Sequence, residues 1–360
     1  MKKAKKAGIS ADDETAVKER TKSRPTLMDV VRESGTSKAT VSRVLNNRPG
    51  VVPALREKVT AAIKKLNYTP VAAARALSLS RSNTLGLVFQ DITAGWLLNV
   101  FRGVMHVATG TGYSVVTALS TVPNDELLLP SRLLAEGRVD GMVWYDPRIT
   151  PEVIAEIKSR RIPFVVVQKQ INDPDVNTVS IENVCGAYLA TKHLLDLGYR
   201  RVMLVTGGDD NEDSRQRLQG ARQALTEFHI KPAAVPTLIG RHVGVHAIKA
   251  LAAYLEEGHH LPEAIFAFND NMAVAILQWL RARGTRVPED VAVVGFDGTD
   301  EADHVGLTTI ATPMYETGIL AAQILLDLIS NGAEDKKARQ ILLSGHLVIR
   351  DSCGARLRHA

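Results

Sequence analysis

The sequence predicts a small all-α headpiece built on a helix-turn-helix, followed by an α/β region of two lobes. Two observations support this prediction. Residues 26–46 carry the capping and turn signals of two short helices, and residues 85–296 contain eight short apolar runs separated by helical segments. Such runs, alternating with helices, are typical of parallel sheets buried on both faces. Because the runs form two series, two lobes are expected.

The first two helices are predicted within residues 26–46, TLMDVVRESGTSKATVSRVLN. Thr26 and Asp29 have the spacing of a capping box, and Ser37 is placed to cap the second helix. Gly35 lies between them, where a helix ends and a positive φ costs little. The second helix directs its apolar residues toward the protein and turns a polar, cationic stripe outward. The apolar residues are Val41, Val44 and Leu45, and the stripe consists of Lys38, Ala39, Ser42 and Arg43.

The outward stripe has the size and chemistry of a helix that reads the major groove of DNA. Arg and Lys donate to guanine O6 and N7, and small side chains between them allow a close approach. Lys38, Ala39 and Arg43 are therefore expected to contact base edges. Neighbouring polar residues are expected to contact phosphates or fix the register, and these are Thr36, Ser37, Thr40, Ser42 and Asn46. A helical hairpin with a solvated charged face is the alternative.

A third helix is predicted from about Pro53 to Leu66, after the loop of residues 47–52 with its Pro-Gly pair. Its apolar residues recur at helical spacing and are expected to close the headpiece core. They are Leu55, Val59, Ala62, Ile63 and Leu66.

Charge is distributed unevenly along the 360 residues. Residues 1–83 hold 18 Lys and Arg against 7 Asp and Glu, whereas the remainder holds 26 against 32. Because neutralisation of phosphates dominates non-specific affinity for nucleic acid, the basic part is expected to contact DNA. Residues 1–24 mix charges of both signs with few apolar groups. A disordered basic tail is expected there, either inert or an arm for the minor groove.

The compartment expected from the sequence is the cytoplasm. Cys185 and Cys353 lie far apart without metal-ligand spacing, as expected for unpaired thiols in a reducing environment. The basic start MKKAKKAG is not followed by an apolar stretch, and no run is long enough to span a membrane. We therefore expect a nucleoid-associated protein without membrane contact.

Two segments, TLMDVVRESGTSKATVSRVLN and LREKVTAAIKKLNYTPVAAARAL, resemble the DNA-binding headpiece of the lactose-repressor (LacI/GalR) family of bacterial transcription regulators. The match runs almost without a gap from Thr26 to Leu77, and weaker family marks continue to about Ile349. The resemblance implies a headpiece at residues 25–69 that binds a near-palindromic operator DNA as a homodimer.

The resemblance also assigns residues 70–83 to a hinge helix and linker. The Ala-rich segment PVAAARAL is too short to be helical alone in water, and in the family it folds when two subunits meet on the operator. By resemblance, Leu77 is the wedge inserted between base pairs in the minor groove, and Ala74 and Arg75 contact the groove or backbone. A plain linker is the alternative.

The sequence departs from the family at the start of the third helix. Val52 and Leu55 stand where the family usually has Ser and Thr. The loss of a side-chain cap weakens this helix start, and Pro53 near the first turn partly offsets the loss.

The resemblance implies that residues 84–355 form a periplasmic-binding-protein-like effector domain, with the ligand between two lobes. One lobe is expected to comprise residues 84–180 and 312–332, and the other residues 181–311 and 333–355. Ligands of open α/β sheets bind beyond the carboxyl ends of the strands. The loops that follow the apolar runs should therefore carry the ligand contacts.

The segment SRQRLQG at residues 214–220 resembles the family segment whose arginine reaches the ligand, which points to Arg217. Asn269 and Asp297 each lie at the end of a predicted strand. These three residues are the first candidates for ligand contact, since together they offer donors and acceptors suited to hydroxyl groups. Trp96 stands where the family has an aromatic residue and is expected to stack on a sugar ring. Gln168 stands where relatives often have a carboxylate that holds a sugar hydroxyl, which weakens the case for a simple neutral hexose. The basic side chains in this set raise an acidic or phosphorylated sugar as a hypothesis. The remaining candidates are Asp91, Trp144, Tyr145, Lys169, Arg241 and His242.

The expected function is that of a transcription regulator, most often a repressor, that binds DNA sequence-specifically. A small carbohydrate-like effector is expected to control its affinity for DNA. No cofactor or metal is expected. The sequence contains no phosphate loop, dinucleotide fingerprint or G-x-S-x-G elbow, which disfavours an α/β enzyme acting on a sugar. A solute-binding protein of transport shares the two-lobe fold but would need an export signal. No leucine heptad follows the last predicted strand, so a dimer is expected rather than a tetramer.

Overall fold

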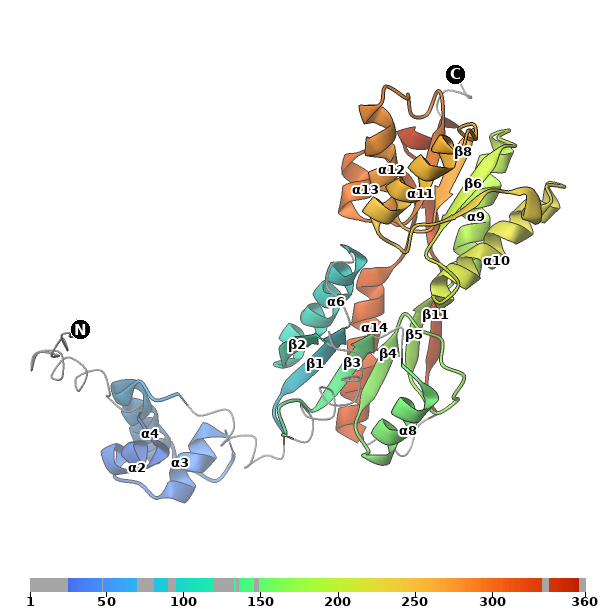
Figure 1. Cartoon of the computed structure of the whole chain (residues 1–360). Coiled ribbons are helices and arrows are strands. Elements are labelled where there is room, and N and C mark those ends of the chain that lie inside the picture. The colour runs from blue at the N-terminus through green and yellow to red at the C-terminus, as the bar shows by residue number, and fades with distance from the viewer. Residues whose placement is uncertain are drawn as a thin grey trace, which may run out of the picture. The chain divides into compact units, whose positions relative to one another are not determined.

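The computed structural model describes residues 25–46, 48–69, 81–89, 95–119, 133, 136–145, 149–331 and 337–355. The chain divides into two compact units, Met1–Ser80 and Arg81–Ala360 (Figure 1). Among the described residues, no helix is both long and apolar enough to cross a membrane. The predicted hinge helix and the N-terminal tail lie outside the described residues.

Three helices form the described part of the headpiece: α2 (Leu27–Ser34), α3 (Lys38–Leu45) and α4 (Pro53–Leu66). The predicted caps are confirmed. Thr26 and Asp29 exchange hydrogen bonds in a capping box at the start of α2. The Ser37 hydroxyl accepts a hydrogen bond from the amide of Thr40 at the start of α3. Gly35 ends α2 with a φ of 61°, a conformation that is easier for glycine than for residues with a Cβ.

Apolar residues from all three helices meet in one small core. As the sequence predicts, α4 begins without a side-chain cap at Val52 and with proline in its first turn. The core prediction is wrong for Leu55, which is 36% exposed, because the burial of α4 begins one turn later. The buried members of the core are Val30, Val41, Val59, Ala62 and Tyr68.

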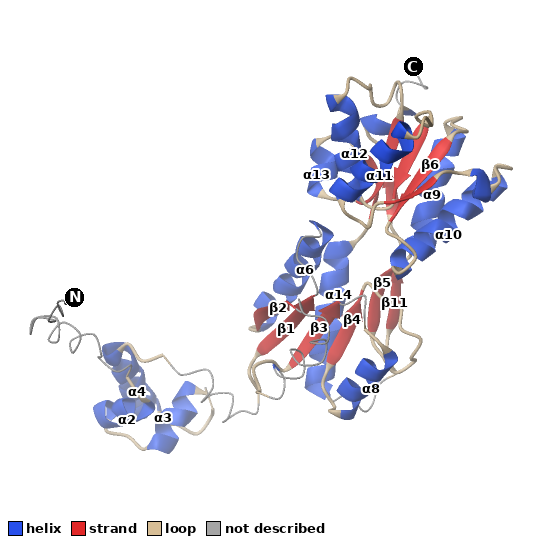
Figure 2. Cartoon of the chain, in the orientation of Figure 1, coloured by secondary structure: helices blue, strands red, loops and turns tan. Residues whose placement is uncertain are grey.

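The first sheet of the second unit has six strands in the order β11-β5-β4-β3-β1-β2, and all its pairs are parallel. Successive residues of a strand point to opposite faces of the sheet and pack in different hydrophobic cores. Leu87 and Val143 pack with the pair α6 (Gly95–Thr111) and α14 (Met314–Asn331), whereas Val88 and Trp144 pack with α8 (Pro151–Ser159). The sheet is therefore covered by helices on both faces (Figure 2). Its strands are β1 (Thr84–Phe89), β2 (Ser114–Leu119), β3 (Gly141–Tyr145), β4 (Phe164–Val167), β5 (Thr178–Ile181) and β11 (Gln340–Leu343).

The second sheet has the order β12-β10-β9-β8-β6-β7, and only its β10–β12 pair is antiparallel. Its strands are β6 (Val202–Thr206), β7 (Thr237–Ile239), β8 (Ala264–Ala267), β9 (Ala292–Asp297), β10 (Thr308–Ala311) and β12 (His346–Val348). The helices of this lobe are α9 (Asn183–Asp196), α10 (Glu212–Glu227), α11 (Gly244–Glu256), α12 (Asp270–Ala282) and α13 (Asp300–His304), with the short 3-10 turns η1 (Pro232–Ala234) and η2 (Asp351–Cys353).

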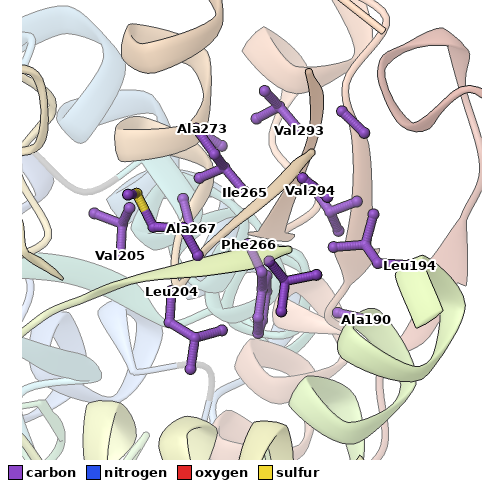
Figure 3. Packing of buried hydrophobic residues seen from close by; sticks show 14 of the residues in the cluster. Ala190, Leu194, Leu204, Val205, Ile265, Phe266, Ala267, Ala273, Val293 and Val294 are labelled. Carbon is purple, nitrogen blue, oxygen red and sulfur yellow. The ribbon is translucent and has the colours of Figure 1, made fainter. Parts of the chain in front are cut away.

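The core of the second lobe is built from the central strands and the helices on either side. Figure 3 shows Ala273 of α12 beside Ile265, and Leu194 of α9 on the side of Val294. Phe266 is fully buried between them. This packing holds the strand ends, and with them the loops that follow, in fixed positions.

Each of the eight predicted apolar runs overlaps a strand, and four strands were not predicted: β5, β10, β11 and β12. Thr and Ser interrupt the apolar pattern of β5 (TVSI) and β10 (TTIA), although these side chains are buried. The other two lie at sheet edges, where only alternate residues are partly buried in β11.

The predicted lobe boundaries are wrong at the C-terminal end. Residues 340–343 were expected in the second lobe, but β11 pairs with β5 in the first sheet. The chain then returns to the second lobe with β12. Backbone pairing at an edge decides this placement, and the hydrophobic pattern of four residues does not specify it.

Candidate functional site

Helix α3 presents the predicted DNA-contacting residues on one face of the headpiece. Lys38, Ala39 and Arg43 are exposed, whereas Val41 is fully buried against the core. Neither Lys38 nor Arg43 has a side-chain hydrogen bond or ion pair within the described residues, so both cations are free to meet a nucleic acid. The polar neighbours are partly engaged in local hydrogen bonds: Thr36 with Ser34, Thr40 with Ser37, and Asn46 with Ser42.

The second unit contains a cleft of about 690 Å³, within the size range of small-molecule sites. Its walls come from both lobes, with α6 and the end of β3 on one side and the strand-end loops of the second sheet on the other. The rings of Trp96 and Tyr145 meet edge to face there, with centroids 5.0 Å apart. Seven of the predicted effector-binding residues line this cleft, and they are Trp96, Tyr145, Arg217, Arg241, His242, Asn269 and Asp297.

Three predicted contacts do not line the cleft, and their side chains are used elsewhere. Trp144 is 1% exposed and packs in the core on the α8 side, because it points to the opposite face of β3 from its neighbours in the strand. Gln168 is buried and donates to the sulfur of Met314 at 3.2 Å. The Lys169 ammonium donates to the carbonyl of Ile149 at 2.8 Å. The predicted contacts Asp91, Ala74, Arg75 and Leu77 lie outside the described residues.

Arg217 is 5% exposed and is held from several sides. Its Nε donates to Asn183 Oδ1 at 2.8 Å, and Nη1 donates to the carbonyl of Phe268. Its guanidinium lies 3.8 Å from the ring centroid of Phe296, and Nη1 lies 3.6 Å from Asp297 Oδ1. A guanidinium fixed in this way is pre-organised, so little conformational entropy is lost when a ligand meets it.

Burial favours the uncharged forms of both Asp297 and His242. Burial raises the pKa of Asp297 to about 8, with Arg217 opposing the rise and nearby carboxyl groups adding to it. Burial, followed by repulsion from Arg217, lowers the pKa of His242 to about 4. A protonated carboxyl can both donate to and accept from a hydroxyl group, which suits polyhydroxylated ligands.

The sequence reasoning missed several polar residues of the cleft and thereby its charge. Asp213 lies four residues before Arg217 in α10, and that spacing places both on one helix face. The basic groups of the lining are Arg217 and Arg241, whereas Lys169 does not line the cleft, and the acidic residues Asp300 and Glu301 stand with them in the same lining. The missed polar residues are Asn99, Asn211, Asp213, Asn271, Thr299, Asp300 and Glu301.

Comparison with known proteins accounts for both units. Residues 26–71 match the model of the bacterial regulatory proteins of the lacI family, and residues 191–353 match that of the periplasmic binding protein-like domain. The chain is similar to catabolite control protein A of Priestia megaterium, with 31% identity over 320 residues, 88% of this chain and 96% of that protein.

Solved structures agree with this match along most of the chain. The lac repressor dimer bound to operator and the anti-inducer ONPF is 28% identical, has a TM-score of 0.80, and covers 91% of this chain and 99% of its own. The transcriptional regulator CelR in complex with cellobiose is 30% identical, has a TM-score of 0.67, and covers 91% of this chain and 100% of its own. With a helix-turn-helix headpiece and a two-lobed effector domain, the chain belongs to the lacI family of bacterial regulatory proteins, whose members are DNA-binding regulators of transcription.

Proposed function

We propose that this regulator is a homodimeric repressor that binds a near-palindromic operator and that a neutral carbohydrate in the cleft controls its affinity for DNA. One observation carries the proposal. The first lobe lines the cleft with an aromatic pair, Trp96 and Tyr145, and the second lobe lines it with the buried side chains of Arg217 and Asp297. Aromatic faces pack on the apolar faces of sugar rings, and the opposite wall offers hydrogen bonds to hydroxyl groups.

The charge of the cleft favours a neutral ligand over an acidic or phosphorylated one. Asp300 and Glu301 line the cleft beside Thr299, and both carboxylates would repel an anion. Arg217 gives two of its N–H groups to Asn183 and the Phe268 carbonyl and keeps the others for ligand hydroxyl groups. CelR, whose structure holds cellobiose, supports the same class of ligand.

A paired ligand screen tests this proposal. Thermal shifts would be measured with cellobiose and glucose and with the anionic counterparts cellobionate and glucose 6-phosphate, since a ligand stabilises the state that it binds. A neutral member should raise the melting temperature and its anionic partner should not. Equal or stronger stabilisation by the anions at low salt would contradict the proposal.

For DNA binding, we propose that the two headpieces of the dimer read the operator through Lys38, Ala39 and Arg43. The exposed, unpartnered cations of α3 support this assignment. Fluorescence anisotropy with labelled duplexes selected from a random pool would find the operator and give its affinity against competitor DNA. Identical affinity for selected and unselected duplexes at moderate ionic strength would contradict it.

We further propose that the protein regulates without catalysis. Candidate sugars incubated with it should be recovered unchanged, as measured by chromatography. The similar proteins include the transcriptional regulator CelR and the lac repressor, and their roles favour this reading.

A further inference from the structure

Two of the loops that wall the cleft have backbone conformations that are strained for residues with a Cβ. Where β9 ends and its loop begins, Asp297 has a φ of 125° and Gly298 a φ of 79°. In the loop after β7, Arg241 and His242 have φ values of 52° and 60°. Non-glycine residues persist at such angles only where neighbouring groups hold them, and they cluster at functional sites. The group that holds each loop is therefore part of the construction of the site.

We propose that Asp270 is the positioning residue that holds the Asp297 loop in its ligand-binding conformation without touching the ligand itself. Asp270 is fully buried and is not among the residues that line the cleft. Its Oδ2 accepts hydrogen bonds from two consecutive amides, those of Gly298 and Thr299, each at 2.8 Å. The Thr299 hydroxyl donates to the same oxygen at 3.2 Å.

The other carboxylate oxygen fixes the direction of the Asp270 side chain. Oδ1 accepts from the Thr309 hydroxyl of β10 at 2.6 Å. A Cβ added at Gly295 of β9 would overlap with this oxygen, so the carboxylate lies against the strand itself. Asp270 is also the first residue of α12, where the partial positive charge of the helix terminus favours a carboxylate. These contacts leave it little freedom to follow a displaced loop.

The residues on either side of Asp270 hold the second strained loop. Asn269 donates to the carbonyl of His242 at 3.0 Å, and Asn271 accepts from the amide of Gly244 at 2.7 Å. The tripeptide Asn-Asp-Asn thus holds both strained loops, the one after β7 and the one after β9. It also supplies a matched control, because Asn271 holds one loop and Asp270 holds the other.

Amide hydrogen exchange, resolved to single residues by NMR, tests the proposal on the full-length protein without any ligand. In Asp270→Ala, protection of the Gly298 and Thr299 amides should fall about tenfold or more, whereas the Gly244 amide should keep its protection. In Asn271→Ala the pattern should reverse. Asp270→Asn should restore part of the protection, since an amide oxygen can accept from both N–H groups but more weakly than a carboxylate.

Native protection of the two amides in Asp270→Ala, or an equal loss at all three amides, would overturn the positioning role. If Asp270→Ala does not fold, the test uses Asp270→Asn alone. In this variant, protection from exchange should fall several-fold at the Gly298 and Thr299 amides only. Unchanged protection, or an equal loss at the Gly244 amide, would refute the positioning role.

One consequence of this inference rests on the proposed function: the Asp270 variants should bind cellobiose about tenfold more weakly. If the native protein does not bind cellobiose, that ligand assignment fails, while the exchange pattern still decides the role of Asp270.

Discussion

Replacing Arg217 by Met should separate effector binding from operator binding. The substitution keeps most of the side-chain volume over Phe296 but removes the guanidinium, which leaves Asn183 Oδ1 and the Phe268 carbonyl without this donor. Each buried acceptor left unsatisfied costs about 1–3 kcal/mol. Because Asp297 is largely protonated at neutral pH, it adds no full buried charge. With two such acceptors, we expect the effector domain to be destabilised by about 2–6 kcal/mol.

The assay combines urea unfolding with operator-binding titrations in the presence and absence of the sugar found by the screen. Arg217→Met should retain operator affinity without sugar and lose the response to sugar. Arg215→Met is the matched control, since this side chain lies on the same helix but is half exposed and pairs with Glu212 at the surface. An exposed pair of this kind contributes about 0–1 kcal/mol. Equal stability of the two variants, or a native response to sugar in Arg217→Met, would refute the reasoning.

Three other predictions concern the reading of DNA, the aromatic wall and the pH response. Arg43→Ala should cost about 1–3 kcal/mol on the selected operator and relax one base position, measured by anisotropy on a set of single-base variants; an equal loss on random DNA would indicate a phosphate contact instead. Trp96→Ala should weaken sugar binding, measured by calorimetry, by about 1–3 kcal/mol while leaving operator affinity unchanged; unchanged sugar affinity would exclude stacking. Because the folded-state pKa of His242 lies near 4, below its ordinary value of 6.5, the unfolded chain binds more protons between these values, and the native protein should lose stability as pH falls from about 6.5 to 4. His242→Asn should remove up to about 3 kcal/mol of that loss in urea titrations at pH 7 and pH 4.5, and parallel pH profiles would contradict the assignment.

Local signals in the sequence were sufficient to predict those features of the structure that depend on neighbouring residues. The caps at Thr26 and Ser37, the turn at Gly35 and the buried face of α3 follow from side chains within four positions of each other. The eight apolar runs likewise became strands, because a segment buried on both faces needs continuous hydrophobicity. The strand-end rule then directed attention to Asn269 and Asp297, and the family resemblance to Arg217, and all three line the cleft.

Tertiary structure decided what local patterns leave open. Trp144 and Tyr145 are adjacent in the sequence, yet one is buried in a core and the other lines the cleft, because successive residues of a strand point to opposite faces. The lobe to which β11 belongs depends on which edge strand offers it free hydrogen bonds. The protonation of Asp297 depends on its burial beside Arg217 and other carboxyl groups. By itself the sequence determined the elements and the family of the protein, since these rest on contacts between near neighbours and on the pattern of apolar residues. Only the fold decided the charge and shape of the cleft, because these depend on side chains brought together from distant parts of the chain.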